Sequence, residues 1–281
     1  MLFMFCIMVI FLSILSMMIN NMIVWWSIFL LMTLLFILMN KLTMSYSSLY
    51  NYFILQESLG LLFLLLTVNY VQLMILLMKI GVAPMHFWIF SITNGLSLMN
   101  LMWFLTLQKL PFLLILLQIM LNYVFFLLIF GLFVCMMQML MMKSYKNLMV
   151  LSSTESFNWI LMSFIFSFIN VVFVFMYYFF LMLYLINKFN DEDKKKYLSW
   201  ETVLVFMNLP FSVNFFVKII GLSEVLKNFN LVMLILLFMM FMSMLSLSFW
   251  MIILSVKNVK NNEYSKVLYF VILPSMLLLL I

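Results

Sequence analysis

Long runs of apolar residues alternate with short polar clusters along almost the whole chain. Dividing the sequence at these clusters gives eleven apolar segments. Each has a length close to the about 20 residues that a helix needs to cross a bilayer. The predicted spans cover residues 2–19, 22–39, 48–68, 70–91, 98–118, 121–142, 148–167, 169–187, 201–226, 229–255 and 266–281. The pattern predicts an all-α polytopic membrane protein with a single transmembrane domain over 1–281.

The composition agrees with this interpretation. Of the 281 residues, 69% are hydrophobic and 8% are charged, and the mean hydropathy is +1.29. Soluble domains have about 45–50% apolar and about 25% charged residues. The composition therefore excludes a soluble domain, and the net charge of +6 calls for a topological explanation rather than a nucleic-acid partner.

Codon bias and the N-terminus point to a compartment. The chain holds 32 Met and 33 Phe, and all of its basic residues are Lys, which is typical of a strongly AT-rich genome such as an animal mitochondrial one. Residues 1–18 have neither a basic start nor a small-residue cleavage site, so they are expected to form a first span and not a targeting peptide. We expect a membrane protein that is made inside the compartment where it works, such as an animal mitochondrion.

The lysines indicate an orientation. With the N-terminus inside, ten lysines fall in inner loops and only Lys227 falls in an outer loop, which is a strong positive-inside signal. The ten are Lys41, Lys143, Lys146, Lys188, Lys194, Lys195, Lys196, Lys257, Lys260 and Lys266. We expect the N-terminus and the polar loop 188–200 in the matrix, and the C-terminus in the intermembrane space.

Three lysines remain inside predicted spans: Lys79, Lys109 and Lys218. A lysine at the centre of a membrane helix costs about 2.5–3.5 kcal/mol on insertion scales, so such residues usually mark ion or proton paths. Lys109 is expected on an uninterrupted helix. The alternative is structural pairing with a buried carboxylate, for which Glu57 and Glu155 are available.

Helix breakers accompany two of these lysines. GVAP at 81–84 follows Lys79, and NLPFS at 208–212 precedes Lys218, so both helices should be discontinuous. Their positions, in the fourth and ninth spans, suggest inverted five-helix repeats over 1–118 and 121–255 with a terminal helix over 266–281. Prolines are also common in ordinary membrane helices, which leaves a simple kink as the alternative.

Four motifs carry a family resemblance. MKIGVAPMHFW, LTLQKLPFL, SYKNLMVLSSTESFNW and MNLPFSVNFFVKIIGLSE resemble, in order, segments of the second-subunit family of respiratory NADH:ubiquinone oxidoreductase in its short animal mitochondrial form. The resemblance implies a proton-translocating membrane-arm subunit that couples quinone reduction elsewhere in the complex to proton pumping. It implies no cofactor in this chain, and as partners the other membrane-arm subunits and lipids, without nucleic acid. The complex, not this chain, would hold the redox site.

The resemblance also assigns roles to residues. Lys79, Lys109 and Lys218 fall on the family's proton-relay lysines, and His86 and Glu224 fall on its histidine and glutamate. The family has a glutamate on the second span where this chain has Phe29, so the usual lysine–glutamate pair is in doubt. Glu57 is the candidate substitute.

Other features admit simpler interpretations. His86 could relay protons or bond a carbonyl freed by the break. Cys6 and Cys135 lie far apart in apolar spans and are expected to be inert, with no metal site. Two other functions remain open: a stand-alone cation/proton antiporter, or a structural spacer subunit without a proton path of its own.

Overall fold

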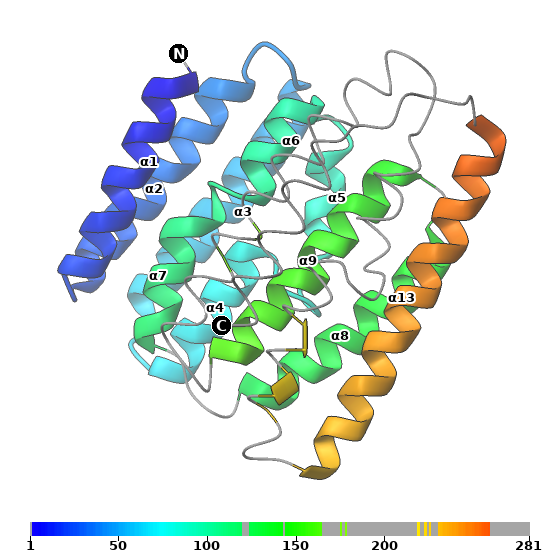
Figure 1. The fold of residues 1–281 in the computed structure, drawn as a ribbon. Coiled ribbons are helices and arrows are strands. Elements are labelled where there is room, and N and C mark those ends of the chain that lie inside the picture. Colours follow the sequence, from blue (N-terminus) through cyan, green and yellow to red (C-terminus); the bar gives the residue numbers. More distant parts are fainter. Residues whose placement is uncertain are drawn as a thin grey trace. The chain divides into compact units, whose positions relative to one another are not determined.

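The computed structural model describes the helical part of the chain that Figure 1 draws as ribbon. The described residues are 2–119, 124–142, 144–164, 175, 178, 218–219, 222–223, 225 and 230–258. The chain divides into two compact units, of which the first comprises Met1–Gly131 with Ser152–Thr154 and the second comprises Leu132–Leu151 with Glu155–Ile281.

Seven helices and the start of an eighth make up the first unit. They are α1 (Leu2–Met18), α2 (Met22–Asn40), α3 (Tyr46–Leu65), α4 (Asn69–Ile80), α5 (Phe87–Thr93), α6 (Leu98–Leu105), α7 (Lys109–Ile119) and the first part of α8 (Val124–Met141). Helix α7 packs against α1 and α4, and α3 packs against α2 and α4. This places α2, α3, α4 and α7 around one core, and α1 and α2 lie side by side in Figure 1.

Polar side chains join these apolar helices at a few points. The Gln118 Nε2 donates to the Ser16 carbonyl at the end of α1 at 3.2 Å, and the Asn100 Nδ2 donates to the Asn40 Oδ1 at 2.8 Å. Between apolar helices, such hydrogen bonds and close packing replace the hydrophobic effect as the source of association.

The second unit contains the rest of α8, most of α9 (Tyr145–Phe164) and α13 (Asn230–Asn258). The Ser246 hydroxyl of α13 donates to the Met139 Sδ of α8 at 3.7 Å. Helix α9 is among the most polar of the helices and brings Glu155 into the interior, where it is 2% exposed. The site in this unit is built on that helix.

The predicted spans agree with the helices wherever the structure describes them. The first seven predicted spans and the one at 229–255 each correspond to a helix or to a pair of short helices, with bounds that differ by a few residues. Those at 169–187, 201–226 and 266–281 lie wholly or almost wholly outside the described residues, as do the break at 208–212 and the loop 188–200. The inverted repeats stay a prediction.

Within the described part of the chain, four helical segments are long and apolar enough to cross a membrane: Met22–Asn40, Tyr46–Leu65, Met99–Ile119 and Val124–Met141. Large apolar side chains lie on their outer faces, such as Leu38 on α2, Leu61 on α3 and Phe126 on α8. These faces suit lipid or neighbouring apolar helices, as the sequence predicts.

The break in the fourth span is confirmed. Helix α4 ends at Ile80, and α5 begins at Phe87. Gly81 has a φ of 73°, and its N–H bonds the Met78 carbonyl while the Val82 N–H reaches back to the Leu77 carbonyl. This is the Schellman arrangement, which favours glycine. A β-carbon at Gly81 would also collide with Ile89, so this end of α4 requires glycine.

The fifth span is also interrupted, which corrects the expectation of an uninterrupted helix around Lys109. Helix α6 ends at Leu105 and α7 begins at Lys109. Pro111 favours the interruption, because it has no N–H for the Leu107 carbonyl and its ring would clash with that carbonyl in a regular helix. The Leu110 N–H takes that carbonyl instead, and the Gln108 N–H bonds the Trp103 carbonyl five residues back.

Candidate functional site

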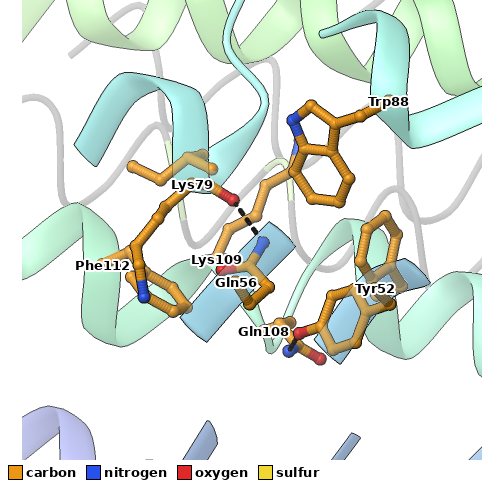
Figure 2. A pocket seen from close by; sticks show the side chains of 9 residues that line it. Tyr52, Gln56, Lys79, Trp88, Gln108, Lys109 and Phe112 are labelled. Atoms are coloured by element: carbon orange, nitrogen blue, oxygen red, sulfur yellow. Dashed lines mark hydrogen bonds between the residues drawn. The ribbon is translucent and has the colours of Figure 1, made fainter. Parts of the chain in front are cut away.

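Lys79 lies in the last turn of α4, immediately before the break, and is 3% exposed. Side chains from two neighbouring helices donate further hydrogen bonds to the carbonyls of this helix end. The Gln56 Nε2 of α3 donates to the Lys79 carbonyl at 3.1 Å, and the Trp88 Nε1 of α5 donates to the Met78 carbonyl at 3.0 Å. Figure 2 shows the Gln56 contact as a dashed line. The broken helix end is therefore fixed, and with it the root of the Lys79 side chain.

The Lys79 ammonium lies against aromatic rings. Its Nζ is 4.5 Å from the ring centroid of Phe29 on α2 and 5.8 Å from that of Phe112 on α7. The two rings are stacked, with centroids 5.1 Å apart and planes inclined by 18°. A cation within about 6 Å of a ring centroid is stabilised by about 2 kcal/mol or more when the pair is desolvated. Phe29, at the position where the family resemblance implies a glutamate, is thus in contact with the predicted lysine.

Glu57 is near Lys79 but is not its direct ion-pair partner. The Glu57 carboxylate interacts electrostatically with Lys79 and accepts a hydrogen bond from the Thr33 hydroxyl at 2.8 Å. Among the described residues, no carboxylate oxygen lies within 4.0 Å of the Lys79 Nζ. Glu57 is also only half-buried. It therefore stands beside the site as a second, more accessible ionisable group.

Lys79 and Lys109 line the same small cavity inside the first unit. The cavity has a volume of about 10 Å³ and is lined by Tyr52, Gln56, Lys79, Ile80, Trp88, Phe104, Gln108, Lys109 and Phe112. This volume is at the lower limit for one ordered water. Figure 2 shows the side chains of α3, α4 and α7 meeting there. Both predicted lysines, each beside a helix interruption, thus contribute to the lining of one cavity.

Two glutamines make the cavity polar. The Gln108 Nε2 donates to the Tyr52 hydroxyl at 2.6 Å, and the Gln56 Nε2 donates to the Lys79 carbonyl. The amide oxygens of both glutamines are buried and have no hydrogen-bond partner among the described residues. Buried polar atoms of this kind are commonly satisfied by ordered water. The lining therefore offers two acceptors for a water between the lysines.

The third predicted lysine forms an ion pair in the second unit. The Lys218 Nζ lies 2.6 Å from the Glu155 Oε1, and both side chains are nearly inaccessible, at 1% and 3%. The Trp159 Nε1, one turn along α9, also donates to this oxygen at 3.3 Å. The structure thus answers a question that the sequence left open, namely which carboxylate accompanies which lysine.

The remaining predicted residues lie elsewhere. His86 is fully buried, precedes α5 and packs against the rings of Phe87 and Phe90, and it is not among the residues that line the cavity. Glu224 lies outside the described residues. Cys135 is buried, and Cys6 is half-buried. The choice between a relay and a structural role for His86 stays open.

Sequence reasoning missed the polar lining of the cavity. Gln56, Gln108 and Tyr52 carry no charge, so nothing marked them among many polar residues of the spans. Gln56 and Gln108 nevertheless lie within predicted spans, and each is no more than 5% exposed. Polar residues within predicted spans, weighed together with the lysines, were the available signal.

A bundle of apolar helices with interruptions beside buried lysines defines a class: polytopic membrane proteins with ionisable groups inside the membrane. No protein-family model matches the chain. The chain is 53% identical to the NADH-ubiquinone oxidoreductase chain 2 of Caenorhabditis elegans, over 96% of both sequences, and 49% identical to that of Ascaris suum, over 98% of this chain and 92% of the relative. These identities over nearly full length show that the chain belongs to the NADH-ubiquinone oxidoreductase chain 2 family.

The fold has a solved relative of distant sequence. A chain of respiratory complex I from Thermus thermophilus superposes with a TM-score of 0.73 at 15% identity, covering 98% of this chain and 77% of that chain. At this identity the likeness concerns the fold alone.

Proposed function

We propose that this chain is a proton-transferring subunit of the membrane arm of NADH:ubiquinone oxidoreductase, embedded in the mitochondrial inner membrane beside other membrane-arm subunits. The names of the relatives support its membership of this complex, and its apolar helices support its location in a membrane. The chain moves protons and makes no covalent bond, so the oxidation of NADH and the reduction of quinone take place in other subunits.

One observation carries the proton-transfer role: Lys79 and Lys109, both 3% exposed, line one buried polar cavity. A spacer subunit has no use for two such lysines, because each buried charge raises the free energy of the folded protein in the membrane. A water held by the amide oxygens of Gln56 and Gln108 would bridge the two side chains. A proton leaving one ammonium could then reach the other amine through that water.

Charge movement nearby provides the switch. A lysine in a low-dielectric site changes its proton affinity when a neighbouring charge appears or leaves. Glu57 lies beside Lys79, and Glu155 lies 2.6 Å from Lys218. Protonation of these carboxylates, or motion of either partner, would shift the lysines between accepting and releasing states. The names of the relatives do not support a stand-alone antiporter, and the buried lysines argue against a passive spacer.

The role of Lys79 is tested by replacing it with methionine, which keeps the length of the side chain and removes the proton site. We expect proton translocation per assembled complex to fall by about fivefold, which is less than a proton-transferring group usually contributes, because the ionisable Glu57 remains near position 79. Lys41→Met is the control, because Lys41 is exposed in the turn after α2. Proton uptake by inverted membrane vesicles, divided by the amount of assembled complex, is the measurement. Equal values for both variants would support the spacer.

The orientation of the chain is tested with single cysteines in two exposed turns. Leu42 and Val68 are 96% and 60% exposed, and they lie at opposite ends of α3. With the N-terminus in the matrix, a membrane-impermeant thiol reagent should label Leu42→Cys from the matrix side and Val68→Cys from the intermembrane side. The unmodified complex gives the background. The reverse pattern of labelling would overturn the proposed topology.

A further inference from the structure

The Lys79 ammonium is surrounded on three sides by groups that carry no negative charge. Phe29 lies at 4.5 Å and Phe112 at 5.8 Å, measured from Nζ to the ring centroids. On the third side is Gly60 of α3, where an added β-carbon would lie 3.4 Å from the Nζ. An added β-carbon would thus be in van der Waals contact with the ammonium, which marks a close approach of α3 to the lysine. The glycine lets the α3 backbone approach while the two rings present their faces.

The two rings are themselves held in place. Phe29 is 1% exposed and packs edge-on against Phe63 of α3, with centroids 5.3 Å apart. It also stacks on Phe112. Because a buried ring that contacts two other rings has little freedom to rotate, the face that it turns to the lysine is fixed before the proton arrives.

We propose that Phe29, backed by Phe112, is the group that holds the protonated Lys79, and that Phe29 acts as a positioning residue for proton transfer at this lysine. The inference rests on the proposed proton-transfer role of Lys79. The π-face of a ring attracts the ammonium but does not attract the neutral amine in the same way. Unlike a carboxylate, a ring accepts no proton. Lys79 can thus be held as a cation although no carboxylate oxygen of the described residues lies within 4.0 Å of its Nζ, and the cavity that Lys109 shares offers its proton a route.

The experiment compares leucine and glutamate at position 29. Phe29→Leu removes one ring face, and we expect proton translocation per assembled complex to fall at least about threefold, which is less than the loss of a full desolvated cation–π contact because the Phe112 ring remains near the ammonium. Phe29→Glu supplies a carboxylate to the same ammonium. We expect this variant to assemble and to retain more translocation than Phe29→Leu, although glutamate is ordinarily the worse replacement for a buried ring.

Phe36 provides the matched control. It lies two turns further along α2, is 0% exposed, and packs against the rings of Tyr52 and Phe104. Phe36→Leu measures the effect of shortening a buried ring. Phe36→Glu introduces a carboxylate with no lysine assigned to it, and we expect it to lose assembly. If the Phe29 ring only fills space, Phe29→Glu should lose assembly as Phe36→Glu does.

Lys79→Met in the same backgrounds separates this inference from the proposed function. If the inference holds, Phe29→Glu is tolerated with Lys79 present and loses assembly in the Phe29→Glu/Lys79→Met double variant. Normal translocation in Lys79→Met alone would overturn the proposed function. The assembly of Phe29→Glu with and without Lys79 would still test the contact between Phe29 and the ammonium. The converse result is reduced translocation in Lys79→Met together with assembly of Phe29→Glu that is as poor as that of Phe36→Glu. This result would overturn the inference and leave the proposed function in place.

Should Phe29→Leu fail to assemble, the inference is decided by Phe29→Glu with and without Lys79. Assembly of Phe29→Glu that depends on Lys79 supports a cation-holding site. Assembly that is independent of Lys79, or absent in both backgrounds, overturns it. Native gels of solubilised membranes give the amount of assembled complex for every variant.

Discussion

Replacing Lys109 with methionine is expected to lower proton translocation per assembled complex by at least about tenfold, because a positioned proton-transferring group commonly contributes about a hundredfold or more. Lys109 begins α7, is 3% exposed, and lines the cavity that it shares with Lys79. Methionine fills the same space without a proton site. The complex should still assemble, because deleting an expensive buried charge need not destabilise a protein.

An arginine at this position separates proton exchange from charge. Lys109→Arg keeps a permanent cation but cannot release its proton. A relay predicts low translocation in both variants, whereas a purely structural cation predicts that arginine restores function. The amount of complex and the proton flux must be measured in the same membranes. Normal flux per complex in Lys109→Met, together with reduced abundance, would contradict the relay.

Much of the fold follows from the sequence because the bilayer imposes a simple rule. Backbone groups inside hydrocarbon must be satisfied within the segment, so apolar runs become helices whose bounds are set by polar clusters. The break at Gly81 was equally predictable, since glycine and Pro84 both oppose continuation of α4. Helices α1 to α3 and α8 agree with their predicted spans to within a few residues.

The interruption before Lys109 was missed because a single proline permits two outcomes. Pro111 can sit in a kinked but continuous helix, or in the first turn of a new one, where its missing N–H has little effect. The structure has the second, with Thr106 at φ −119° and ψ −81°. That choice depends on the packing of α7 between α1 and α4, which a linear pattern does not contain.

The side-chain contacts between helices could not be predicted from the sequence either. Which carboxylate lies beside which lysine depends on how the helices are rotated about their axes, and a hydrophobic pattern constrains rotation weakly when nearly every residue is apolar. Glu155 was available to any lysine, yet it lies beside Lys218. Lys79 lies over Phe29, an aromatic contact that a search for opposite charges does not consider.

The buried pair of Lys218 and Glu155 gives the second large effect, on assembly. Lys218→Met leaves the Glu155 carboxylate inside the protein with only the Trp159 donor among its described hydrogen-bond partners. Removing one partner of a buried ion pair destabilises a protein by about 3–5 kcal/mol. We expect the assembled complex to fall below about a tenth of its normal level on native gels, since about 1.4 kcal/mol corresponds to a tenfold change in an equilibrium.

The double variant Lys218→Met/Glu155→Gln should restore assembly, because glutamine leaves no charge stranded and its oxygen can still accept from Trp159. Proton translocation should nevertheless stay low in the restored complex, since neither position can then exchange a proton at neutral pH. Glu155→Gln alone leaves the lysine without its carboxylate and should assemble poorly, as Lys218→Met does. If the double variant recovers both assembly and full proton flux, the pair is structural and the proton path does not include it. If it recovers assembly without flux, the stability of the pair and its role in proton transfer are separated in one chain.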